Sequence, residues 1–304
     1  MAKSPDSDVP AMSVVIPSVN GWADLDRCLA ALDRERASTR LEVLVPERCG
    51  QSVREAVAGK YPWARTFPVP TTMTIPQMRA LAIGVATAPV VAVIEDHVIV
   101  PAGWAKAMYG ACRGEARVVG GGLVNAATDS VVDWAAWLCE YSHLAGPMPM
   151  GKVDGIHGNH TVYDRALLVR FRDVVESGRW EDALHDAFRA NGIDLWSRPD
   201  IVAGHEKHYT IREYTSQRYY YSRAYAAIRL SGAKRPKRLA FGFVAFVLPP
   251  VLLFRIVSRV WKGGLYRSHL ASSLPLLALF VCAWGFGEVA GAWFGDGGAM
   301  AKVA

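Results

Sequence analysis

The chain has 304 residues, of which 51% are hydrophobic and 20% charged, and its net charge is +6. This length suits one large α/β domain or two small ones, and the five cysteines stand singly without a CxxC pair, which argues against a zinc knuckle and a disulfide framework. Residues 1–12 are polar and lack an apolar core segment, so the sequence predicts no signal peptide and a main domain in the cytoplasm.

Strands and helices alternate in the first hundred residues. Short apolar, β-branched runs predict buried strands at 13–17, 41–45 and 90–94, and helical spacing predicts helices at 22–32, 52–58 and 77–86. The proline-rich stretch 61–76 is predicted to be a connection. This alternation is typical of a parallel sheet, in which ligands bind at the carboxyl ends of the strands.

Three titratable residues, Glu95, Asp96 and His97, directly follow the third of these strands. Because burying such side chains without partners is costly, they predict a ligand, a metal or a pairing network nearby. Pro17 and Glu47 follow the first two strands. All five residues are therefore predicted to share one crevice.

The middle of the chain carries shorter signals. Strands are predicted at 117–124 and 155–162, where glycines permit close approach of the backbone, and at 201–203. A helix is predicted to begin within 166–171, and 180–191 is amphipathic and ends at a glycine.

The C-terminal region is apolar and basic. Residues 239–254 are uncharged, and 268–287 contains only His269 as a residue able to carry a charge, so the second stretch is long enough to span a bilayer and the first is marginal. The cluster Lys234, Arg235, Lys237 and Arg238 precedes them, and a basic cluster beside an apolar segment favours anionic lipid headgroups over nucleic acid. The sequence predicts a main domain over 1–232 and a membrane-associated helical hairpin over 233–304.

Two spans would place four basic residues on the side opposite the cytosolic domain: Arg255, Arg259, Lys262 and Arg267. The positive-inside rule opposes that arrangement. A re-entrant or interfacial hairpin, kinked at Pro249 and Pro250, removes the conflict, and both arrangements remain open.

Six ordered blocks across residues 11–230 resemble the family 2 glycosyltransferases of the GT-A fold, of the membrane-associated bacterial type. The blocks are SVVIPSVN, LEVLVPE, MRALAIGVATAPVVAVIEDH, GNHTVYDRALL, WEDALHDAFRANG and QRYYYSRA. The resemblance implies a Rossmann-like nucleotide-sugar-binding domain and transfer of a single sugar, with inversion, from a nucleoside diphosphate sugar. It also implies a divalent metal, Mn²⁺ or Mg²⁺.

The resemblance assigns a donor site. Pro17 and Ser18 match the segment that lies against the nucleotide base. Glu47 stands where an acidic residue holds base or ribose, although Glu-Arg-Cys-Gly replaces the usual Asp-Asp-Gly-Ser. Arg79 has the offset of the arginine that reaches the nucleotide; without the resemblance, it would be taken for a solvated helix charge.

The metal motif of the family is Asp-x-Asp, which reads Glu-x-His here. Glu95 and His97 are the expected ligands, Asp96 lies between them on the donor side, and His205 is a further candidate ligand. Imidazole can ligate Mn²⁺ and suits Mg²⁺ poorly. The alternative is a hydrogen-bond network without metal.

Glu181 and Asp182 match the family's acidic pair that opens a helix after the acceptor loop. Asp182 is the expected base, a role suited to a partly buried carboxylate near the acceptor, and Glu181 the orienting partner or acceptor contact. The alternative is a pair of helix N-terminal charges. His157, Gly158 and Asn159 match the loop that approaches the sugar or acceptor.

Gln217 and Arg218 begin a segment similar to the Gln-x-x-Arg-Trp motif and are the expected diphosphate contacts. Tyr220 and Tyr221 stand where Arg-Trp would be, which argues against a long-chain polymerase. The tyrosines could equally be core or interface aromatics.

The sequence thus favours a glycosyltransferase acting on a lipid-linked or envelope-glycan acceptor at the cytosolic face of the cell membrane. The altered motifs leave open a non-catalytic, nucleotide-binding membrane scaffold of the same fold. A nucleotidyltransferase would need a glycine-rich phosphate loop after the first strand, which this sequence lacks.

Overall fold

The computed structural model describes residues 9–303; residues 1–8, which belong to the polar segment 1–12, and residue 304 lie outside the described residues. The chain forms two compact units. The first contains the described residues up to Val124 together with Met148–Glu206, and the second contains Asn125–Pro147 and the residues from Lys207 onward. The second unit thus begins before the predicted boundary at 232 and includes an earlier segment of the chain.

The first unit is built on a nine-stranded mixed sheet with the order β3-β2-β1-β4-β8-β6-β9-β5, and β7 also pairs with β9. The strands are β1 (Met12–Val15), β2 (Leu41–Glu47), β3 (Ala64–Pro68), β4 (Val90–Ile94), β5 (Val98–Ile99), β6 (Val118–Asn125), β7 (Gly151–Val153), β8 (His160–Asp164) and β9 (Leu195–His205). The first four are mutually parallel, and β8 joins β4 antiparallel. The predicted α/β class is confirmed.

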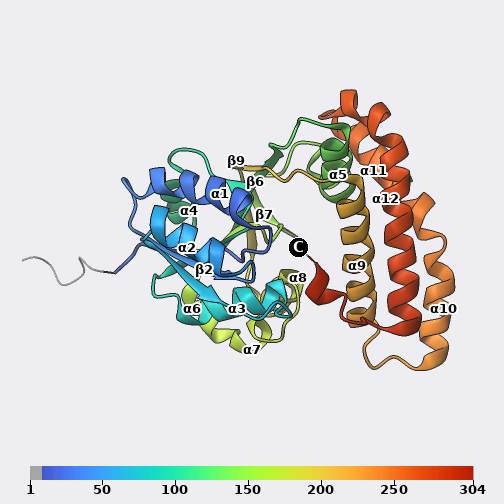
Figure 1. The fold of residues 1–304 in the computed structure, drawn as a ribbon, viewed down its shortest axis with the longest axis horizontal. Coiled ribbons are helices and arrows are strands. Elements are labelled where there is room, and N and C mark those ends of the chain that lie inside the picture. The colour runs from blue at the N-terminus through green and yellow to red at the C-terminus, as the bar shows by residue number, and fades with distance from the viewer. Residues whose placement is uncertain (1–8, 304) are drawn as a thin grey trace, which may run out of the picture. The chain divides into compact units, whose positions relative to one another are not determined.

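The helices of this unit are α1 (Trp22–Glu35), α2 (Gln51–Lys60), α3 (Ile75–Val85), α4 (Trp104–Ala111), α6 (Arg165–Arg170), α7 (Arg172–Val175) and α8 (Glu181–Ala190). α3, α6, α7 and α8 gather on one side of the sheet, and α1 and α4 lie on the other (Figure 1). The strand β3 was predicted to be part of a connection. It is a partly exposed edge strand that contains a proline, so it shows no clear apolar alternation.

Register brings the carboxyl ends of three strands together. Val15 of β1 lies opposite Leu44 of β2 on one side and Val93 of β4 on the other. The residues that follow these strands therefore meet at one edge of the sheet. The strands are held there by burial: all five residues of β4 are buried, and packing such side chains against helices supplies most of the stabilisation.

The second unit consists of α5 (Val131–Tyr141), α9 (Ile211–Arg229), α10 (Arg235–Ala245), α11 (Leu248–Gly263) and α12 (Arg267–Phe294), with short 3₁₀ helices at Ser142–Leu144 and Met300–Lys302. Within it, α12 lies between α9 and α10 (Figure 1). Among the described residues, α12 is the one helix long and apolar enough to cross a membrane by itself; α10 and α11 together also pass, but they bend by 53° at their junction.

Candidate active site

The loops after β1 and β4 are joined by one carboxylate. Asp96 is buried, and its Oδ2 accepts hydrogen bonds from the backbone N–H groups of Val19, at 2.9 Å, and Asn20, at 3.0 Å. The side-chain amide of Asn20 donates to Oδ1 at 2.7 Å. Asp96 therefore holds the edge of the sheet together, and its oxygens are engaged within the protein.

The same carboxylate determines the orientation of His97. Nδ1 of His97 lies 3.0 Å from Oδ1 of Asp96. A carboxylate only accepts, so Nδ1 carries a proton; when the ring is neutral, Nε2 presents its lone pair on the opposite side of the ring. A carboxylate behind an imidazole is the usual support of a metal-ligating histidine.

Three candidate ligand atoms converge in front of that lone pair. Nε2 of His97 lies 3.0 Å from Nε2 of His205 and 3.3 Å from Oε2 of Glu95, and the last two atoms are 3.8 Å apart. His205 reaches this place because β9 pairs with β5, which sets His205 opposite Val98. The sequence prediction that Glu95, His97 and His205 come together agrees with this geometry.

The donor set fits a divalent cation. Two ligand atoms that are each about 2.1 Å from an ion and about 90° apart lie about 3.0 Å from each other, which is close to two of the three distances here. Two imidazole nitrogens with one carboxylate oxygen suit Mn²⁺, Fe²⁺ or Zn²⁺ better than Mg²⁺. All three atoms lie within 4.8 Å of one another.

Charges in this cluster shift the pKa values of Glu95 and His97. Burial alone would raise the pKa of Glu95, but the hydrogen bond to His97 and the nearby cationic groups lower it well below its usual range. Burial alone would lower the pKa of His97, but the hydrogen bonds to Asp96 and Glu95 outweigh it and raise the pKa to about 9. Without a cation, His97 is therefore protonated at neutral pH, beside the carboxylates of Glu95 and Asp96.

A short relay supports Glu95 from the loop before β8. The amide Nδ2 of Asn159 donates to Oε2 of Glu95 at 3.0 Å, and Oδ1 of Asn159 accepts from Nδ1 of His157 at 2.9 Å. Nε2 of His157 is buried with no partner among the described residues. Burial lowers the pKa of His157, so its ring is neutral at neutral pH. Both residues were predicted to contact sugar or acceptor; here they contact each other, and Asn159 also contacts the Glu95 carboxylate.

Arg79 links this cluster to the predicted catalytic pair. Its side chain is buried and forms ion pairs with Glu181 and, at 3.6 Å, with Glu95. Burial alone would lower the pKa of Arg79, but the charges of Glu181 and Glu95 raise it. Arg79 is therefore not a solvated helix charge.

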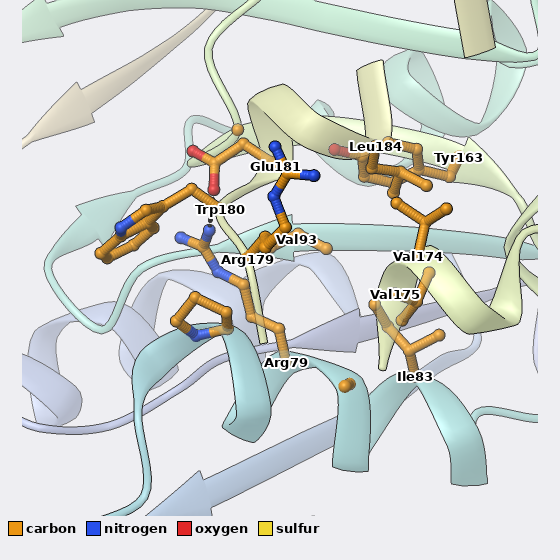
Figure 2. Close-up of a pocket in the computed structure, with 13 residues that line it drawn as sticks. Arg79, Ile83, Val93, Tyr163, Val174, Val175, Arg179, Trp180, Glu181 and Leu184 are labelled. Carbon is orange, nitrogen blue, oxygen red and sulfur yellow. Dashed lines mark hydrogen bonds and ion pairs between the residues drawn. The ribbon is translucent and has the colours of Figure 1, made fainter. Parts of the chain in front are cut away.

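A pocket of about 440 Å³ opens beside this ion pair. Figure 2 shows Arg79, Arg179, Trp180 and Glu181 at one part of its wall and an apolar group at the other. The apolar group consists of Ile83, Val93, Val174, Val175 and Leu184. Gly158 also lines the pocket, and a Cβ there would lie 1.9 Å from Cγ of Glu181, so only glycine fits beneath this carboxylate.

Asp182 lies in the first turn of α8 with an exposed side chain. The partial burial expected for a base is absent. Its Oδ1 accepts from the backbone N–H of Ala183 at 2.8 Å.

The predicted base-binding residues have local partners. Pro17 and Ser18 are buried at the end of β1. Glu47 is fully buried; Oε2 accepts from the N–H groups of Cys49, at 2.8 Å, and Gly50, at 3.0 Å, and Oε1 pairs with Arg54. Both Glu47 oxygens thus stabilise the loop that leads into α2.

Gln217 and Arg218 belong to α9 of the second unit. The guanidinium of Arg218 is buried, lies 3.1 Å from Glu140, and faces the rings of Tyr214, Tyr221 and Trp284 at 5.0 to 5.5 Å. This environment gives Arg218 a role inside that unit, and the prediction of diphosphate contact stays untested.

Two residues near the cluster were not singled out from the sequence. Asn20 stands in a Ser-Val-Asn-Gly turn, where its contact with Asp96 depends on tertiary structure. His160 is buried one residue after Asn159, and its Nε2 accepts from the indole of Trp104 at 2.7 Å. No pattern in the sequence distinguishes such contacts beforehand.

The chain matches no protein-family model and no curated protein. Among solved structures, it is similar to the mannosyltransferase PcManGT from Pyrobaculum calidifontis in complex with GDP-Man and Mn²⁺, with a TM-score of 0.53 and 18% identity over 93% of this chain and 88% of that chain. S. aureus TarS 1-349 gives a TM-score of 0.49 and 13% identity over 90% of this chain and 71% of that chain. The first comparison shows that this chain shares the fold of a glycosyltransferase.

Proposed function

We propose that this chain is a metal-dependent, inverting glycosyltransferase of family 2 that moves a single sugar, a hexose, from a nucleoside diphosphate sugar to an acceptor. One observation carries the proposal: Glu95, His97 and His205 converge at the carboxyl edge of the sheet, in a fold shared with a mannosyltransferase whose structure holds GDP-Man and Mn²⁺. Ligands of parallel sheets bind at this edge.

Each residue of the cluster has a distinct task in this proposal. Glu95, His97 and His205 would hold the cation, which when bound neutralises charge on the diphosphate leaving group. Asp96 fixes the tautomer of His97, and Asn159 orients the Glu95 carboxylate. Arg79, between Glu95 and Glu181, places a fixed positive charge beside the site.

The acceptor side is assigned to α8. Asp182 would accept the proton of the acceptor hydroxyl as that oxygen attacks, and Glu181, held by Arg79 over Gly158, would form the wall of the acceptor pocket. An exposed side chain at the first turn of a helix is accessible to an acceptor that approaches from outside the protein. Gly158, which admits Glu181, is part of this wall.

We further propose a lipid-linked or envelope-glycan acceptor at the cytosolic face of the cell membrane. The support is the apolar and basic character of α10, α11 and α12. An enzyme held at a membrane surface meets lipid-borne acceptors at high local concentration.

The decisive experiment is a screen of nucleotide sugars by thermal unfolding, with and without Mn²⁺. A bound ligand stabilises the folded state by about 2.7 kcal/mol at a hundredfold excess over Kd, so a true donor raises Tm when the metal is present. His97→Ala should abolish the metal-dependent part of the shift. His208→Ala is the control, because His208 is partly exposed and bonded to Asp133 in the second unit. Equal shifts in both variants would refute the metal site.

A second candidate is a non-catalytic scaffold of the same fold, because Glu47, the residue expected to hold the base or ribose of the donor, has both carboxylate oxygens occupied within the protein. The two candidates differ in turnover. If a donor binds but is not consumed in the presence of any metal or acceptor extract, the scaffold is correct; metal-dependent release of nucleoside diphosphate establishes the transferase.

A further inference from the structure

The second unit exposes most of the large hydrophobic side chains on the surface of the protein. Thirteen of the 21 that are exposed among the described residues lie on or between α10, α11 and α12. They include every exposed phenylalanine and tryptophan in the described part of the chain: Phe243, Phe246, Phe254, Trp261, Phe286 and Phe294. Exposed apolar surface of this extent marks an interaction site.

The densest part of this surface runs from the end of α10 into α11. We call it the apolar face; it comprises Phe243, Val244, Phe246, Val247, Val251 and Phe254. Phe254 and Phe243 are 73% and 65% exposed. A bend of 53° between the two helices lies in the middle of the face, so neither helix continues as a straight span.

A row of cations lies beside the apolar face. Arg255, Arg259 and Lys262 are exposed at positions i, i+4 and i+7 of α11, and Arg255 lies one helical turn beyond Val251 of the apolar face. From residue 233 to 287 the sequence contains eight lysines and arginines and no aspartate or glutamate. An apolar stripe with a basic stripe beside it is typical of a helix that lies in the plane of a membrane surface.

The packing of α12 opposes a transmembrane position. Of residues 280–292, only Cys282 and Phe286 are exposed, because α9 and α10 cover this half of the helix. The contact with α9 is intimate: a Cβ on Gly287 would lie 2.0 Å from Oγ of Ser222, and one on Gly291 would lie 2.2 Å from the Arg223 carbonyl oxygen.

Some of the side chains that α9 brings to α12 are charged. Arg218 faces Trp284, and Arg229 forms an ion pair with Glu288 of α12 itself. If α12 crossed the hydrocarbon core, these charges would enter it, and charged side chains in membrane interiors are rare and costly. On this packing, α12 is the core helix of the second unit.

We propose that the second unit binds the surface of an anionic bilayer through the apolar face and the adjacent Arg255, Arg259 and Lys262, with α10 and α11 in the membrane plane and without a membrane-spanning helix. The charge argues for lipid over a second copy of this chain, because two such faces would repel each other. The proposal does not depend on catalysis, since vesicle binding needs neither donor nor metal.

Vesicle flotation with the purified full chain tests the binding. Vesicles of phosphatidylcholine in which a third of the lipid is phosphatidylglycerol should bind the chain, vesicles of phosphatidylcholine alone should bind it at least tenfold more weakly, and high salt should weaken the first interaction. Phe243→Ser with Phe254→Ser should lower the affinity at least tenfold. Met150→Ser with Val169→Ser, also exposed but in the first unit, is the matched control.

The charge row has its own variants. Arg255→Gln, Arg259→Gln and Lys262→Gln together should weaken binding to the anionic vesicles about 100-fold. Lys106→Gln, Arg113→Gln and Arg170→Gln remove the same charge from exposed positions of the first unit and should leave binding unchanged.

Topology is tested in sealed inside-out membrane vesicles from cells that express the full chain. The cysteines that are not buried are first removed by Cys49→Ser and Cys282→Ser. One new cysteine is then placed near each end of α12, at an exposed position, by Ser268→Cys or Lys302→Cys. Both cysteines should react with an impermeant maleimide without detergent, and alkaline carbonate should release the protein. The proposal would be overturned if either cysteine reacts only after detergent is added, or if the protein stays in the membrane at alkaline pH. It would also be overturned if the chain does not bind vesicles, or if it forms a dimer that is lost in Phe243→Ser with Phe254→Ser.

Discussion

Asp96 shows how a single side chain can hold a candidate site together through contacts within the protein. It accepts from two backbone N–H groups of the loop after β1 and from Nδ1 of His97. Its position between Glu95 and His97 would also suit a direct donor contact, but its oxygens are directed into the protein. Backbone donors and an imidazole together explain why an aspartate stands at a buried position.

The base assignment makes the sharpest prediction at this scale. Asp182→Asn keeps the size of the side chain and removes its ability to take a proton. The rate of sugar transfer should therefore fall by about 100-fold to 10,000-fold, the usual contribution of a general base. The measurement is the steady-state rate of nucleoside diphosphate release, with donor affinity followed separately. Affinity should stay within about twofold of the wild type, since no donor contact is removed.

Asp186→Asn is the matched control for that variant. Asp186 lies one helical turn further along α8 and is exposed, where it pairs with Arg189. Both substitutions remove one exposed charge from the same helix. If the two variants retain equal transfer rates, Asp182 is not the base.

At the scale of single elements, the β6 strand depends on a neutral histidine. Nδ1 of His160 lies 2.8 Å from the Gly122 carbonyl, which can only accept, and Nε2 lies 2.7 Å from the Trp104 indole, which can only donate. His160 therefore carries its proton on Nδ1. Gly121 leaves room for this ring, because a Cβ there would lie 2.2 Å from Cε1 of His160.

This environment predicts sensitivity to acid. Burial lowers the pKa of His160 to about 3, whereas an unfolded chain has a histidine pKa of about 6.5. Between these values the unfolded state binds a proton that the folded state does not, so the free energy of unfolding falls as pH drops below about 6.5, by up to about 1.4 kcal/mol per pH unit. Above that pH, His160 contributes no pH dependence.

Denaturant titrations at several pH values measure this slope. His160→Gln keeps a donor and an acceptor but cannot be protonated, so its slope between pH 4 and 6, a window within the range of about 3 to 6.5, should be shallower than that of the wild type by about one proton. An unchanged slope in His160→Gln would contradict the buried neutral state.

The elements that could be predicted from the sequence are those with strong local patterns. The apolar run of β4 and the amphipathic pattern of α8 are visible in the sequence because burial of one stripe or a whole strand dictates residue type. The exposed edge strand β3 lacks such a pattern. The loop at 155–159 was predicted to be strand, because its sequence continues smoothly into β8.

The candidate site was predictable where the end of a buried strand or the resemblance supplied a position. Glu95, His97 and His205 lie together as expected, although His205 is more than a hundred residues away from the other two in the sequence. The partners of these residues, Asn20 and Asn159, depend on which loops meet in space. Hydrogen bonds across such sequence distances leave no periodic signal, so sequence reasoning assigned Asn159 to the acceptor rather than to Glu95.

At the scale of the whole molecule, the chain is divided by packing and not by composition. The boundary was predicted at 232 because the apolar, basic region starts there. However, α9 precedes that boundary and packs along α12. α5, nearly a hundred residues before the boundary, belongs to the same unit. A unit assembled from two separate segments has no single boundary in the sequence.

Truncation at residue 232 therefore should not yield a soluble domain. It would remove α10, α11 and α12 and expose the face of α9 that α12 covers, including Tyr214, which packs on Phe280 with ring centroids 4.5 Å apart, and the buried Arg218. Newly exposed apolar surface promotes association. Size-exclusion chromatography of the 1–232 fragment should show aggregates, whereas co-expression with the 233–304 fragment should restore a stable complex. A monomeric 1–232 fragment with a cooperative melting transition would show instead that α9 and α5 fold without α12.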